Sequence, residues 1–140
     1  MENQAQETNN DEMNDVQFIN EFNKIAQLVN HVAMTKGFWE ERVRLVNESL
    51  PDMKTFADQC MVSSALSLIH SEISEALEAS RHGNPNDDKI TNYSGVEAEL
   101  ADAIIRIMDL CYYKKWDIAG AIIEKIKYNT SRPYKHGKQF

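Results

Sequence analysis

The stretches IHSEISEALE, at residues 69–78, and EAELADAIIR, at residues 97–106, decide how this chain folds. Each combines apolar residues spaced by three and four, the period of an amphipathic α-helix, with two acidic residues three positions apart. Residues three apart on a helix share one face, with Cβ atoms roughly 5–6 Å apart. Two such helices, packed together, could direct four carboxylates at one cation: Glu72, Glu75, Glu99 and Asp102.

The same apolar period predicts helices at residues 15–34, 38–46, 52–81, 96–115 and 117–130. Asp117 is placed to cap the last of them, and Pro51 disfavours helical geometry just after the second. Residues 83–95 concentrate Gly, Asn, Asp and Pro, so they predict a loop between the two acidic helices. No segment shows the pattern of a strand. We therefore expect an all-α fold, a bundle of about four to five helices, with an irregular tail at residues 131–140.

The length of 140 residues fits one compact domain. Residues 1–14 are rich in Asn, Gln, Glu and Asp and contain almost nothing apolar, so we expect a disordered polar tail there. Residues 15–140 are expected to form a single helical domain. Cys60 and Cys111 both lie within apolar helical patterns, which predicts two reduced core thiols rather than a disulfide.

The charge balance is acidic, with 22 Asp and Glu against 15 Lys and Arg. This argues against a partner that is a nucleic-acid polymer, because such binding needs a broad basic surface. No apolar run approaches the length of a membrane span, and no secretory leader is recognisable, so we expect no membrane partner and a cytoplasmic location.

Acidic pairs spaced by three are common on solvated helix faces, so one pair alone says little. Here each pair borders an apolar stripe, and carboxylates crowded at a helix seam repel one another unless a cation compensates them. No Cys or His lies at a matching helical offset, which favours Mg²⁺ or Mn²⁺ over zinc. The loop after residue 83 does not fit an EF-hand, because Lys89 stands where glycine is needed and Gly95 where the bidentate glutamate is needed.

Magnesium held by few protein oxygens takes further ligands from phosphate, which points to a nucleotide substrate. Basic residues gather in the stretch KYNTSRPYKHGK, at residues 127–138. Lysines near a helix C-terminus also have a simple explanation in the helix dipole. Arg132 is the strongest candidate for a phosphate contact, because its planar guanidinium can bind bidentately.

These three stretches together resemble the all-α nucleoside triphosphate pyrophosphohydrolases, specifically the single-domain MazG-like proteins. The order ExxE, intervening loop, ExxD is the signature of that family, and the basic stretch is a further match. The resemblance implies an enzyme that converts a nucleoside triphosphate and water to the monophosphate and pyrophosphate. It also implies Mg²⁺ or Mn²⁺ at Glu72, Glu75, Glu99 and Asp102, with a water oriented for attack on the α-phosphoryl group and one of these carboxylates accepting its proton.

The resemblance further implies a homodimer or homotetramer, with the pocket formed partly between chains. By the same resemblance, His31 and residues 36–39 belong to the nucleotide pocket. Trp39 and its neighbour Phe38 either stack on the base or belong to the core, and the sequence leaves both alternatives open. The other expected substrate contacts are Arg106, Lys127, Asn129, Arg132 and Lys138.

Two other readings of the sequence compete with an enzyme. The chain would be a non-catalytic nucleotide or metal sensor on the same fold if it bound nucleotide without turnover. It would be an adaptor bundle if the acids were only a solvated face. The base, the sugar and the choice between ordinary and modified nucleotides are not encoded in any pattern that we recognise.

Overall fold

The structure, a computed structural model, describes the backbone of residues 2–133 and the side chains of residues 14–133. This part of the chain contains five helices and no strand. The helices are α1 (Glu2–Thr35), α2 (Glu40–Glu48), α3 (Lys54–Arg81), α4 (Gly95–Lys114) and α5 (Ile118–Thr130). The expectation of an all-α fold with four to five helices is confirmed. None of the helices in the described residues is long and apolar enough to cross a membrane.

The start of the first helix differs from the prediction. Helix α1 begins at Glu2, whereas the apolar period begins only after Asp15. The apolar period marks only the part of a helix that has an apolar face, and a helix can continue into a segment without one. The division into a tail at residues 1–14 and a domain at residues 15–140 stays a prediction. Lys138 lies outside the described residues.

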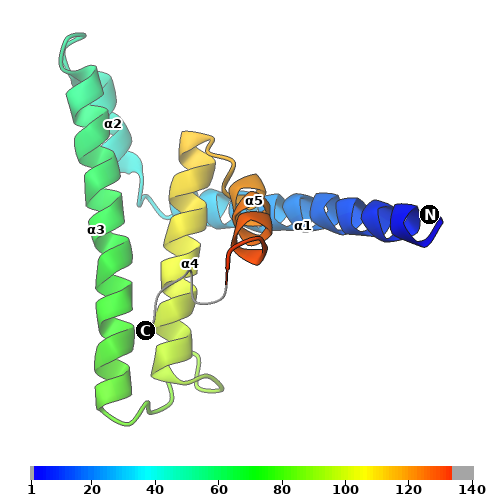
Figure 1. The fold of residues 1–140 in the computed structure, drawn as a ribbon. Helices are drawn as coiled ribbons and strands as arrows, with labels where there is room; N and C mark the ends of the chain where they lie inside the picture. The colour runs from blue at the N-terminus through cyan, green and yellow to red at the C-terminus, as the bar shows by residue number, and fades with distance from the viewer. Residues whose placement is uncertain (1, 134–140) are drawn as a thin grey trace.

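The helices form a crossed arrangement rather than a parallel bundle. Figure 1 shows α3 and α4 side by side and running in opposite directions, with α1 lying across α4. Helix α2 packs against α3, and α5 packs against α1. The N-terminal part of α1 extends beyond α5 (Figure 1).

The turn between α3 and α4 fixes the relative position of the two acidic helices. Gly83 adopts a φ of +83°, which a glycine accepts without strain, and Asn84 Oδ1 then accepts a hydrogen bond from Val96 N at 2.9 Å. Ser94 and Glu97 form a capping box at the start of α4, in which Glu97 Oε2 accepts from Ser94 N at 2.8 Å. The Ser94 side chain and backbone lower the pKa of Glu97 through these hydrogen bonds. The loop expected at residues 83–95 is present, and its side chains cap the start of α4 through defined hydrogen bonds.

Small side chains dominate the core of the described residues. Of twelve buried apolar residues seven are alanines, so the helices approach closely while most large apolar side chains remain outside. The largest core cluster joins α3 and α4 to the corner between α1 and α2; it consists of Trp39, Met61, Ala65 and Leu110.

Trp39 anchors that corner. It is only 1% exposed, and its ring stacks on Tyr113 with 3.9 Å between centroids. Its Nε1 donates to Asp109 Oδ2 at 2.9 Å, and Asp109 Oδ1 also accepts from Asn30 Nδ2 at 2.7 Å. Of the two roles left open for Trp39, the structure shows the core role. Its neighbour Phe38 is 69% exposed.

The expectation for the two cysteines holds for one of them. Cys111 is buried between α1 and α4, and burial raises the pKa of its thiol. Cys60 is exposed, so the prediction of a core thiol there is wrong. On α3 the buried positions are Ala57, Met61 and Ala65, and Cys60 lies one residue, about 100°, off that stripe.

We expect Trp39→Ala to lower the free energy of unfolding by about 3–5 kcal/mol, because it removes a buried ring and leaves Asp109 with one donor fewer. Urea unfolding at one fixed protein concentration measures this. Phe38→Ala is the matched control and should change the free energy by less than about 0.5 kcal/mol. Equal losses for both variants would contradict the anchoring role of Trp39.

Candidate functional site

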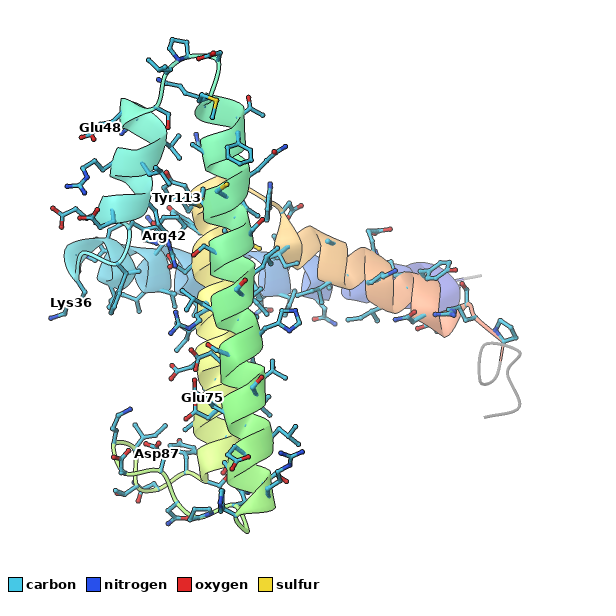
Figure 2. The ribbon with its side chains drawn as sticks, turned by 90° about the vertical axis from the view of Figure 1, so that its left-hand side faces the viewer. Lys36, Arg42, Glu48, Glu75, Asp87 and Tyr113 are labelled. Atoms are coloured by element: carbon cyan, nitrogen blue, oxygen red, sulfur yellow. The ribbon has the colours of Figure 1, made fainter. Side chains whose placement is uncertain are left out.

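Three of the four predicted carboxylates come together between α3 and α4. Glu72, Glu75 and Glu99 each offer one oxygen, and these oxygens lie within 4.8 Å of one another. Asp102, one turn after Glu99, is outside this group but close enough for its charge to act on Glu99. Figure 2 shows Glu75 on the flank of α3, between the loop that carries Asp87 and the helix crossing near Arg42.

The three carboxylates differ in burial. Glu72 is 5% exposed, Glu99 is half-buried and Glu75 is exposed. The cluster thus has a closed end at Glu72 and an open end at Glu75. A cation would lose water on one side and keep it on the other.

Arg106 neutralises the buried end. Its Nε donates to Glu72 Oε1 at 2.6 Å, and its own side chain is 42% exposed. An unpaired carboxylate as buried as Glu72 would be costly, because desolvation disfavours its charge. The guanidinium supplies the missing counter-charge in the chain as it stands.

The remaining negative charge falls on Glu99. Burial raises the pKa of the Glu99 carboxyl, and a side-chain hydrogen bond with Glu72 raises it further. The charges of Glu75, Glu72 and Asp102 act in the same direction. Glu99 therefore holds its proton to a higher pH than an isolated glutamate would.

The donor set fits a hard divalent cation. All three ligand atoms are carboxylate oxygens, contributed by two helices that the capped turn holds in register. Oxygen ligands of this kind suit Mg²⁺ and Mn²⁺, whereas structural zinc sites prefer sulfur or nitrogen. A cation would also relieve the repulsion that raises the pKa of Glu99.

A cavity of about 360 Å³ adjoins the acids at Asp102 and Arg106. It lies between α1, the α1–α2 corner and α4, and its walls combine aliphatic side chains with polar ones. The lining residues that carry the argument are Val29, Phe38, Arg42, Asp102, Arg106 and Asp109. An apolar pocket with a few converging polar groups is the usual form of a small-molecule site.

Sequence reasoning missed two of the four charged residues that line this cavity, Asp109 and Arg42. Asp109 continues the polar series Glu99, Asp102, Arg106 at spacings of three and four, so it lies on the same face of α4, and this spacing could have revealed it. Arg42 enters from α2, with its guanidinium 5.4 Å from the centre of the Trp39 ring. No signal in the sequence separates Arg42 from its neighbour Arg44, which pairs with Glu41 on the surface.

The other predicted substrate contacts lie elsewhere in this chain. His31 is exposed on α1 and does not line the cavity. Lys127, on α5, pairs with Asp15 at 3.0 Å, and the hydrogen bond to Asp15 raises its pKa. Asn129 and Arg132 are exposed at the end of α5, where the Arg132 guanidinium lies 5.6 Å from the centre of the Tyr128 ring. The structure brings none of these four residues to the carboxylates within one chain.

A larger cavity, of about 490 Å³, lies between α1, α4 and the start of α5. Phe22, Met108, Cys111 and Trp116 are among its lining residues. It contains none of the four carboxylates, and its charged lining residues are Lys115 and Asp117, so it offers no metal site for a phosphate chain.

Comparisons of the chain with protein-family models, with curated proteins and with solved structures found no match. The resemblance to the MazG-like proteins therefore stays an expectation from the sequence. What the site does has to be argued from its own geometry.

Proposed function

We propose that this protein is a Mg²⁺-dependent nucleoside triphosphate pyrophosphohydrolase, which forms a nucleoside monophosphate and pyrophosphate. The observation that carries the proposal is the group of three carboxylates from two helices, open on one side and bordered by a cavity with two arginines. The resemblance of the acidic motifs and the basic stretch supports the same reaction.

In this proposal Glu72, Glu75 and Glu99 hold the cation, with Asp102 beside them. A divalent cation there supplies charge neutralisation on the phosphate oxygens and orientation of the attacking water. The chain itself supplies the rest. The cavity takes the nucleoside, and its aliphatic walls exclude water from one side of it. Arg106, between the cavity and the acids, lies where the phosphate chain would cross.

Glu75→Gln and Glu99→Gln should each reduce pyrophosphate release by at least about 100-fold. Each removes the charge of a metal ligand, and mutating even a residue that only hydrogen-bonds to a metal ligand typically costs about 10–100-fold in metal affinity or activity. The assay uses purified protein, Mg²⁺ and a panel of ordinary and modified nucleoside triphosphates, and it quantifies pyrophosphate.

Glu78→Gln is the matched control, because Glu78 lies on the same helix, is exposed and pairs with Arg81 instead. It should keep wild-type activity. A folded wild-type chain that releases no pyrophosphate from any nucleotide would overturn the proposal. Nucleotide binding without turnover would favour the sensor.

The raised pKa of Glu99 predicts how stability depends on pH without metal. A carboxyl whose pKa is higher in the folded state binds its proton more tightly there than in the unfolded chain. Protonation of Glu99 therefore stabilises the folded state, and this stabilisation is complete below the ordinary pKa of 4.5. That effect is lost as the pH rises through the raised folded value. Thermal unfolding in EDTA should show this loss in the wild type and not in Glu99→Gln. A wild-type profile identical to that of the variant would contradict it.

We also propose that the active form is a homo-oligomer. A folded monomer of 16.1 kDa is expected to expose about 7,400 Å². This chain exposes 10918 Å². In its described part many large apolar side chains are exposed, while seven of the twelve buried apolar residues are alanines.

The exposed apolar residues of α4 support this proposal, and we place the second copy there. The α4 stripe Leu100, Ile104, Met108 and Cys111 is covered by α1 only at Met108 and Cys111. Leu100 is 42% exposed and Ile104 is 54% exposed, beside the acids. A second copy on this surface would also offer the basic end of its α5, which does not reach the acids of its own chain.

Ile104→Glu should therefore produce a monomer, because a charge on the contact face loses its water on association. Light scattering coupled to gel filtration measures the mass. Leu50→Glu, in the exposed turn before α3, should leave the mass unchanged. A wild-type chain that is monomeric at high micromolar concentration would contradict the oligomer.

A further inference from the structure

The contact between Arg106 and Glu72 has a second consequence if Glu72 is a metal ligand. The Arg106 guanidinium, at 2.6 Å from Glu72 Oε1, already compensates the charge of a carboxylate that belongs to the group of three. A divalent cation and a guanidinium on one carboxylate repel each other, and the burial of Glu72 weakens the screening of that repulsion by water. Metal binding and the Arg106–Glu72 pair therefore compete.

The Arg106 side chain has an alternative position, in the cavity beside the acids, if its contact with Glu72 is broken. Arg106 follows Glu99 and Asp102 on the same face of α4, one turn further along, and its side chain is 42% exposed. It also lines the 360 Å³ cavity beside the acids. Leaving Glu72 for that cavity requires only rotation about side-chain bonds, with no movement of a helix.

We propose that Arg106 is a metal-dependent arm. It neutralises Glu72 in the metal-free chain, and it is released to the phosphate chain of the substrate when a divalent cation takes Glu72. This inference rests on the proposed function and deepens it, because it makes metal binding a condition for the full affinity of the site for phosphate. By linkage, a phosphate chain that holds Arg106 also strengthens metal binding by the same factor.

The first test measures the metal alone. In Arg106→Gln the competitor of the cation is gone, so Mn²⁺ should bind about tenfold more tightly than in the wild type. Electron paramagnetic resonance of free Mn²⁺ measures this without any turnover. Arg42→Gln is the matched control: Arg42 lines the same cavity, and no carboxylate pairs with it among the described side chains. Its Mn²⁺ affinity should stay within about twofold of the wild type.

A second measurement covers the case in which Arg106→Gln is poorly folded without metal, since it leaves Glu72 buried without a counter-charge. Saturating Mn²⁺ should then raise the melting temperature of Arg106→Gln by more than that of the wild type. Arg106→Lys keeps the charge on Glu72, so both its Mn²⁺ affinity and its thermal shift should stay close to the wild-type values.

The third measurement tests whether Arg106 is released from Glu72 to the phosphate chain. Inorganic tripolyphosphate is a probe without a base, and with saturating Mg²⁺ it should bind Arg106→Gln at least fivefold more weakly than the wild type. Weaker or unchanged Mn²⁺ binding in Arg106→Gln would overturn the proposal of a metal-dependent arm, because Arg106 would then stay beside the metal-bound carboxylate. If the wild type releases pyrophosphate, that result leaves the proposed function intact. A wild-type chain that binds no Mn²⁺ would overturn both.

Discussion

The close antiparallel contact of α3 with α4 is the constraint on which the rest of the structure depends. Alanines at the contact let the two backbones approach, and the capped turn at residues 83–97 fixes how far one helix is displaced along the other. Glu72 and Glu75 therefore lie close to Glu99, with Glu72 buried and Glu75 open to solvent. Without this register the acidic residues would be two unrelated pairs on two helices.

Most of the fold could be predicted because its information is local. Apolar spacing located the helices, and the Gly, Asn, Asp and Pro residues of the stretch 83–95 located the loop between α3 and α4, whereas the Ser94 cap is a finding of the structure. The start of α1 could not be predicted, since residues 1–14 contain almost nothing apolar and a helix without an apolar face leaves no period in the sequence. The exposure of Cys60 was missed for a related reason: one residue, about 100°, separates a buried position from an exposed one, and a broad apolar pattern does not resolve that difference.

The sequence predicted the acidic residues of the candidate site, but it did not predict the cavity beside them. The acids repeat at a helical spacing, whereas the cavity is assembled from α1, α2 and α4, which are distant in sequence. Trp39 illustrates the difficulty. Its indole fits a base-stacking role and a core role equally well until the partners Asp109, Asn30 and Tyr113 are known. Arg106 was expected at the substrate, but its contact with Glu72 depends on tertiary structure alone.

The unequal burial of the carboxylates has a consequence for stereochemistry. With Glu72 closed off and Glu75 open, a bound cation can meet a phosphate chain from one side only. In the proposed reaction the two non-bridging oxygens of the α-phosphate would then not be equivalent, because only one of them would face the cation. Replacing either oxygen by sulfur creates a pair of diastereomers, and a site with this asymmetry would distinguish between them.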